Sequence, residues 1–238
     1  MNPSTVPPAS TPDPDRARFY ADDAAWYASR LRIEDYMESI EQATQRKVTV
    51  ASFDLIARAR PDVQCFNELL IQYPIARQRQ PGRVIPDNFV VVHPVPIVAG
   101  GSFAVDVQPV GPLLVLEYVS KHNPRKDYED NFVRYEQALR VPYYLLFYPD
   151  NEELTLFRLA AGKYQSVPPN DAGRFAVPEL ELEVGIEGGW ARFWFRGERL
   201  PLPAELADRA EAAEQRAAVA EAELARLREE LARRPGGG

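Results

Sequence analysis

The chain has 238 residues, of which 45% are hydrophobic, and this supplies enough apolar material for one packed domain with an appendage. Its single cysteine excludes an internal disulfide framework and a cysteine-rich zinc site, and it fits a reducing compartment. A formal net charge of -7 argues against a protein that coats nucleic acid through bulk positive charge, although a bound cation would reverse the field locally.

The beginning of the chain has the composition of a disordered leader. Residues 1–20 carry repeated prolines with serine and threonine and little apolar periodicity. They include neither the basic nor the apolar part of a signal peptide, and no later stretch is apolar for long enough to cross a bilayer. We therefore expect a cytoplasmic protein without a membrane partner. From residue 31 on, apolar residues are spaced as on one face of a helix, at Ile33, Tyr36, Met37 and Ile40.

The middle of the chain has the densest strand signals. Residues 47–50 are a short apolar segment that we interpret as an edge strand or as a connector into residues 53–56. Residues 63–73 are apolar and aromatic with polar interruptions, which predicts one curved strand. Two further strands are predicted over Phe89–His93 and Leu113–Val119, on either side of a loop rich in glycine and proline.

A helix and a buried strand follow these elements. Residues 125–139 are predicted to be helical, with a buried stripe made of Phe132, Val133, Tyr135 and Leu139. Val141-Pro142 ends this helix, and the apolar residues 143–148 predict a central strand. The order of strand, helix and strand requires a parallel crossover, which places residues 143–148 beside the strand that contains Glu117. Two hairpins complete an α/β domain over residues 31–200, the first from residues 154–159 with 164–167 and the second from 180–184 with 190–195.

The composition then changes abruptly to alanine, glutamate, arginine and leucine. Over residues 204–234 an apolar seam repeats every seven residues, at Leu206, Ala210, Ala213, Ala217, Ala220, Leu224, Leu227 and Leu231. This repeat predicts a C-terminal coiled-coil helix that pairs two copies of the chain as a homo-oligomer, most simply a dimer. The alternative is a single solvated helix stabilised by pairs such as Glu205 with Arg209.

Two acidic residues interrupt otherwise apolar strands, and they are the most informative residues of the chain. Asp87 precedes the apolar run 89–92, and Glu117 follows the apolar run 113–116. A buried carboxylate without a partner costs several kcal/mol, roughly, unless a metal or another cation receives it. Two carboxylates that converge from adjacent strands suit a hard divalent cation such as Mg²⁺. Basic residues flank both acids in the segments 77–83 and 121–126, where each group is either a phosphate contact or a solvated loop.

The order of these residues resembles the Uma-type family of restriction-endonuclease-like proteins in the PD-(D/E)XK nuclease superfamily. The resemblance covers roughly residues 33–195 and rests on four features in order, namely Pro86-Asp87, the apolar run ending in Glu117, the segment Asp127–Tyr135, and the return strand from Val141. It implies a restriction-endonuclease-like mixed β-sheet core flanked by helices.

The resemblance also implies the residues of a catalytic site. Asp87 and Glu117 match the two acids that bind the metal and carry out catalysis, and Glu68 lies where many relatives have a further acidic ligand. Tyr135 matches a tyrosine common in relatives, and its simplest role is core packing with a bonded hydroxyl.

One residue of the superfamily pattern is missing. The lysine two residues after the second acid would fall at Val119, and relatives of the Uma type carry a lysine at the position that is Asn131 here. An ammonium group would stabilise the negative charge that grows on the phosphate, whereas asparagine offers a donor without a charge. We expect Lys121 to supply this charge, with Lys126 as the second candidate.

Two functions follow from this pattern. The first is a DNA endonuclease that depends on Mg²⁺ or Mn²⁺ and hydrolyses phosphodiester bonds. The second is a catalytically inactive binding or assembly module that keeps the nuclease-like scaffold and oligomerises through its C-terminal coiled coil. The replaced lysine, the acidic net charge and the long tail favour the second hypothesis.

Overall fold

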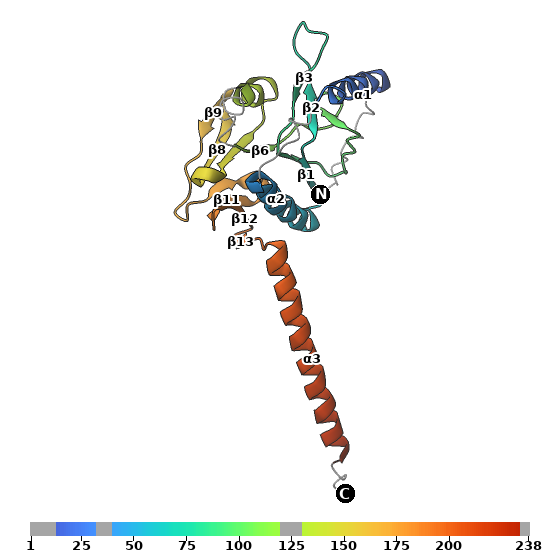
Figure 1. Cartoon of the computed structure of the whole chain (residues 1–238), viewed down its shortest axis with the longest axis vertical. Coiled ribbons are helices and arrows are strands. Elements are labelled where there is room, and N and C mark those ends of the chain that lie inside the picture. The colour runs from blue at the N-terminus through green and yellow to red at the C-terminus, as the bar shows by residue number, and fades with distance from the viewer. Residues whose placement is uncertain (1–12, 32–39, 120–129, 234–238) are drawn as a thin grey trace, which may run out of the picture. The chain divides into compact units, whose positions relative to one another are not determined.

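The computed structural model of the chain describes residues 13–31, 40–119 and 130–233. The chain divides into two units, a mixed α/β unit up to Leu200 and a helical unit from Pro201 on. The elements of both units are labelled in Figure 1.

A six-stranded sheet forms the centre of the larger unit, in the order β1-β4-β6-β7-β8-β9. Its strands are β1 (Val63–Asn67), β4 (Asn88–Val92), β6 (Leu114–Tyr118), β7 (Tyr143–Tyr148), β8 (Glu153–Ala160) and β9 (Lys163–Ser166). Strands β6 and β7 are parallel, and the other neighbouring pairs are antiparallel. The predicted crossover is thereby confirmed, and its described part includes the π-helical segment η3 (Arg134–Ala138). Every residue of β6 is buried, as expected for a strand covered on both faces.

Two smaller sheets flank the central one. The three-stranded sheet consists of β3 (Gly82–Val84), β2 (Leu70–Tyr73) and β5 (Ser102–Ala104). The four-stranded sheet consists of β10 (Phe175–Val177), β11 (Leu182–Glu187), β12 (Trp190–Phe195) and β13 (Glu198–Arg199). The short 3₁₀ turn η4 (Pro149–Asn151) connects β7 and β8 of the central sheet, and η5 (Pro178–Leu180) connects β10 and β11 of the four-stranded sheet. Both predicted hairpins are confirmed, as β8 with β9 and as β11 with β12.

Helix α1 (Pro14–Ala28) packs against β5 and is tied to the β2–β3 hairpin. Asp23 accepts hydrogen bonds from Gln72 Nε2 at 2.7 Å and from Arg83 Nε at 2.8 Å. Burial alone would raise the pKa of Asp23, but these hydrogen bonds and the charge of Arg83 outweigh it and lower the pKa. Residues 14–20, which the composition assigned to a disordered leader, therefore belong to an anchored helix, and Tyr20 is buried.

Helix α2 (Ile40–Ala59) packs against β1 and β12. The prediction of a strand or connector at residues 47–50 is wrong, because this segment lies inside α2. Its buried residues Val48, Ser52 and Ile56 recur every four positions, so tertiary packing of one helical face overrides the strand preference of the β-branched residues. Of the helix predicted from residue 31, residues 32–39 lie outside the described part, and Ile40 is exposed.

The single strand predicted over residues 63–73 is also wrong, since the chain forms β1 and β2 in two different sheets. The break occurs at Glu68, whose φ of 47° lies in the left-handed region. On η3 and the residues on either side of it, Phe132, Tyr135 and Leu139 pack into the core, but Val133 is 48% exposed, contrary to the predicted stripe.

An aromatic cluster joins the central sheet to the three-stranded sheet. Phe89 on β4 stacks on Phe66 of β1 with ring centroids 5.0 Å apart, and it meets Phe103 of β5 edge-on at 5.1 Å. Phe89 and Phe103 are completely buried. Because Asp87 lies two residues before Phe89, this cluster fixes the backbone on which the first acid is carried.

The second unit is the helix α3 (Pro203–Arg233). Its apolar side chains remain exposed in the single chain, with Leu206 at 38%, Leu224 at 51% and Leu227 at 48%.

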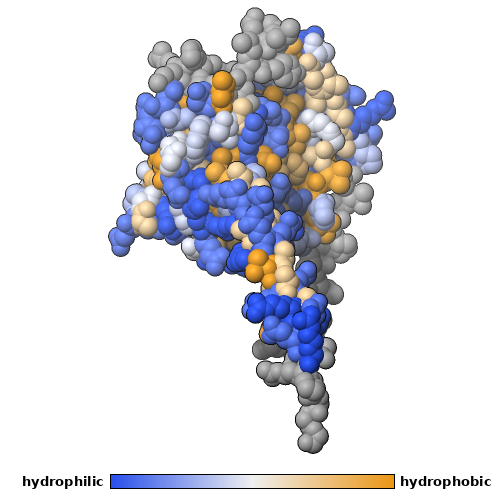
Figure 2. Space-filling model, turned by 60° about the horizontal axis from the view of Figure 1, so that its bottom comes forward, coloured by the Kyte–Doolittle hydropathy of each residue, from blue (hydrophilic) through white to orange (hydrophobic). Residues whose placement is uncertain are grey.

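The face of the molecule shown in Figure 2 is mainly hydrophilic, with hydrophobic residues in small separate groups. Among the helices that the structure describes, none combines the length and the apolar character needed to span a bilayer.

Candidate active site

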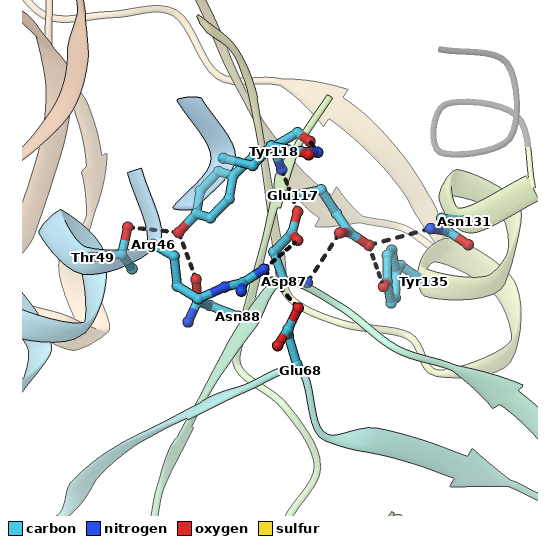
Figure 3. Close-up of polar contacts among 10 residues, drawn as sticks. Arg46, Thr49, Glu68, Asp87, Asn88, Glu117, Tyr118, Asn131 and Tyr135 are labelled. Atoms are coloured by element: carbon cyan, nitrogen blue, oxygen red, sulfur yellow. Dashed lines mark hydrogen bonds and ion pairs between the residues drawn. The ribbon is translucent and has the colours of Figure 1, made fainter. Parts of the chain in front are cut away.

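The structure brings the two predicted acids together. Asp87 directly precedes β4, Glu117 lies on β6, and these strands pair with Asn88 opposite Leu116. The backbone N–H of Asp87 donates to Glu117 Oε2 at 3.1 Å, and the backbone N–H of Tyr118 donates to Asp87 Oδ2 at 2.6 Å. Figure 3 shows the two carboxylates side by side at the end of the strands. Each acid is thus oriented by the backbone of the other strand.

Glu117 is only 5% exposed, and hydrogen bonds from several residues stabilise its carboxylate. Besides the Asp87 N–H, the Tyr135 hydroxyl donates to Glu117 Oε1 at 2.7 Å, and Asn131 Nδ2 donates to the same oxygen at 3.2 Å. Burial, and then the charge of Glu117, raise the pKa of Tyr135 well above its usual value. The phenol therefore stays protonated and remains a donor, and Tyr135 orients Glu117 as well as packing in the core.

Glu68 is linked to Asp87 through the guanidinium of Arg46. Its backbone N–H donates to the Asp87 carbonyl at 3.2 Å, and its side chain is 55% exposed. Arg46 Nη2 lies 2.8 Å from Glu68 Oε1 and 3.6 Å from Asp87 Oδ1, so one guanidinium links both carboxylates (Figure 3). Arg46 could not be predicted as part of the site, because a single arginine 41 residues before Asp87 gives no local signal of a contact with it.

Tyr118 anchors the acidic strands to α2. Its buried hydroxyl donates to Asn88 Oδ1 at 2.5 Å and lies 2.6 Å from Thr49 Oγ1, while its carbonyl accepts from Gln42 Nε2 at 2.9 Å. Burial raises the pKa of Tyr118 well above its usual value, so the hydroxyl stays neutral. These contacts join residues up to 76 positions apart. Strand periodicity therefore gave no indication of them.

The side chains of this site fit a divalent cation that is held by the carboxylates of Asp87 and Glu117. Within residues 13–31, 40–119 and 130–233, no group of three or more histidine, cysteine, aspartate or glutamate side chains is arranged to hold a metal ion. Mg²⁺, however, is commonly held by one or two carboxylates together with waters. Hydrogen bonds from the backbone N–H groups of Asp87 and Tyr118 and from the Tyr135 hydroxyl orient both carboxylates, as hydrogen bonds to metal ligands commonly do.

The source of positive charge differs from the superfamily pattern. Val119 is 2% exposed and packs in the core, so its position offers no cation to the site. Lys121 and Lys126, predicted to supply the charge, lie outside the described residues. Asn131, where the resemblance implies a lysine, donates to Glu117 Oε1 and also accepts a hydrogen bond from Arg134 Nη1 at 3.1 Å.

Comparison with known proteins agrees with the residue pattern. The model of the Uma2 family, whose description reads "Putative restriction endonuclease", matches residues 30–192. A solved structure from Anabaena variabilis, described as a putative nuclease belonging to DUF820, is similar with a TM-score of 0.44 and 15% sequence identity, over 60% of this chain and 75% of that one. No curated protein gives a significant match. The family match confirms the Uma-type resemblance drawn from the ordered motifs.

Proposed function

The chain belongs to the Uma2 family of putative restriction endonucleases, and on this premise we propose that it is a metal-dependent endonuclease that hydrolyses phosphodiester bonds in DNA. The observation that supports this proposal most is the pair of carboxylates Asp87 and Glu117, joined by reciprocal hydrogen bonds between adjacent strands. We further propose a cytoplasmic location, supported by the single cysteine, which suits a reducing compartment.

Asp87 and Glu117 would hold Mg²⁺ or Mn²⁺. When bound, such an ion lowers the pKa of a water molecule and neutralises charge on the phosphate. Tyr135 and Asn131 keep one oxygen of Glu117 oriented, and the Tyr118 N–H does the same for Asp87. In the hydrolysis, the oxygen of water bonds to phosphorus and one P–O ester bond breaks. The proton that the water loses is balanced by the proton that the leaving oxygen gains.

Local positive charge supports DNA as the substrate despite the acidic net charge. The loop between β2 and β3 carries the exposed residues Arg77 and Arg79. Arg83, on β3, is instead held by Asp23 and contributes to the fold. Phosphate contacts of this kind supply affinity that is independent of sequence and decreases with salt.

Metal-dependent cleavage of a supercoiled plasmid tests the proposal. The wild-type chain is expected to nick or linearise the plasmid with Mg²⁺ or Mn²⁺ and to stop when the metal is chelated. Asp87→Ala should abolish cleavage, because one of the two carboxylate ligands is lost. Asp171→Ala serves as the control, since Asp171 is exposed and should cut like wild type. Equal cleavage by Asp87→Ala and wild type would refute the assignment.

The inactive module remains the second candidate because Val119 occupies the lysine position of the superfamily pattern. This hypothesis predicts DNA binding that weakens strongly with salt while no product forms with either metal. Binding at two salt concentrations, measured beside the cleavage assay, separates the two functions.

We also propose that α3 pairs two copies of the chain, as its exposed leucines Leu224 and Leu227 suggest. Leu224→Glu places a charge in the predicted seam and should convert a dimer into a monomer of 26.9 kDa. Ala222→Glu adds the same charge two residues away, outside the seam, and should leave the dimer intact. Sedimentation equilibrium measures both masses, and a monomeric wild type at micromolar concentration would exclude pairing through this helix.

A further inference from the structure

A phosphodiesterase of the proposed kind needs a positive charge near the phosphate. The transition state carries more negative charge than the substrate, and a fixed cation in a partly dry site stabilises the difference. The position two residues after Glu117 cannot provide it here, since Val119 is buried among apolar side chains. The described residues near the acids contain two arginines that could serve, Arg46 and Arg134.

Asn131 connects Arg134 to the catalytic carboxylate. Arg134 Nη1 donates to Asn131 Oδ1 at 3.1 Å, and Asn131 Nδ2 donates to Glu117 Oε1 at 3.2 Å. One amide therefore spans the guanidinium and the carboxylate, with its acceptor toward the cation and its donor toward the acid. In Figure 3 the Asn131 side chain points from its helix toward Glu117. Arg134 follows Asn131 by three residues, so both side chains lie on neighbouring parts of one helical surface.

The two arginines differ in what neutralises them. Arg46 contacts the carboxylates of Glu68 and Asp87, which offset its charge. In the part of the chain that the structure describes, Arg134 makes its one hydrogen bond to the neutral amide of Asn131 and forms no ion pair. A guanidinium has five N–H donors, so most of its donors remain available to a phosphate.

The charge of Arg134 influences Tyr73, the last residue of β2. Burial raises the pKa of Tyr73, and the nearby charge of Arg134 acts in the opposite direction. Tyr73 ends β2, where the loop carrying Arg77 and Arg79 begins.

We propose that Arg134 supplies the cation of this active site and contacts a non-bridging oxygen of the scissile phosphate, with Asn131 as its positioning residue. This inference rests on the proposed nuclease function. Arginine keeps its proton at any relevant pH, so its contribution is charge and hydrogen bonding and not proton transfer. Asn131, at the position of the family lysine, then orients the guanidinium of Arg134, which lies about one turn further along the helix.

Kinetics of Arg134 variants test the inference. Arg134→Ala should lower kcat by about 10²- to 10³-fold, the usual loss when one donor to a developing anion is removed. Arg134→Lys should restore part of the rate, and added guanidinium ion should rescue Arg134→Ala but not the wild type. A structural role alone gives no such rescue. Arg158→Ala removes an exposed arginine from β8 and is the control for loss of one charge.

Two further measurements test the inference without relying only on the cleavage rate of Arg134→Ala. In DNA binding without metal, the slope of log K against log salt should fall by about one in Arg134→Ala, since one phosphate contact is lost. The double variant Asn131→Lys with Arg134→Ala should recover cleavage, because it returns an ammonium group to the lysine position of the family.

The outcomes separate this inference from the function on which it rests. If the wild type cuts and Arg134→Ala cuts equally well, or if Lys121→Ala or Lys126→Ala alone abolishes cleavage while Arg134→Ala does not, the inference is wrong and the nuclease assignment stands. If the wild type cuts nothing with either metal, both are overturned.

Discussion

Replacing Glu117 with glutamine is expected to reduce metal-dependent cleavage by about 10³-fold or more. Loss of a residue that merely orients a metal ligand costs roughly 10- to 100-fold, so loss of a ligand charge should cost more. Glutamine keeps the size of the side chain but has one acceptor oxygen, whereas Glu117 accepts hydrogen bonds on both oxygens. The rate should be measured with saturating Mg²⁺ and again with Mn²⁺.

Glu136→Gln provides a matched control for this variant. Glu136 is also 5% exposed and accepts hydrogen bonds from the Tyr164 N–H at 2.8 Å and Lys163 Nζ at 2.9 Å. These hydrogen bonds lower the pKa of Glu136, so Glu136, like Glu117, is a carboxylate held by hydrogen bonds within the fold. Both substitutions should cost about 1–3 kcal/mol in urea unfolding, since each removes a buried charge that accepts hydrogen bonds from more than one donor. Cleavage should fall in Glu117→Gln alone; a similar loss in both would show that stability, and not ligation, explains the effect.

Phe89→Ala is expected to lower the free energy of unfolding by about 3–5 kcal/mol, the largest stability effect that we anticipate from one substitution. The side chain is fully buried and contacts Phe66 and Phe103, so alanine leaves a cavity where two sheets meet. Urea denaturation followed by circular dichroism measures the change.

Phe19→Ala is the corresponding control, because Phe19 is 47% exposed on α1. It should change the stability by roughly 0.5 kcal/mol or less, as surface substitutions usually do. If the two phenylalanine variants unfold at the same urea concentration, the aromatic cluster does not hold the sheets together.

The sequence predicted those parts of the site that depend on local pattern. A carboxylate after an apolar strand is informative in itself, so Asp87 and Glu117 could be identified before their contacts were known. The parallel placement of β6 and β7 followed from the predicted order of strand, helix and strand. The family resemblance added Glu68, Asn131 and Tyr135.

Other parts depend on packing that no local pattern records. Helix α2 contains a β-branched stretch at residues 48–50, and only its burial against β1 and β12 makes the helix favourable there. Arg46 belongs to this helix, and its ion pairs with Glu68 and Asp87 depend on how the helix packs and not on any local pattern. The turn at Glu68 needs a left-handed backbone in a residue that rarely adopts it, and no glycine marks the position.

Neighbouring residues on a strand point to opposite faces of the sheet, and β6 shows what this means for access to the acids. Glu117 points toward Tyr135 of η3, whereas Tyr118 points toward Thr49 of α2. Helical segments therefore contact both faces of β6 at this point, and the backbone of the proposed nucleic acid substrate would approach along the strand ends, next to Asp87, which directly precedes β4. A duplex in that position presents its sugar–phosphate edge first, so the choice of cutting site would have to be made by protein segments other than the sheet itself.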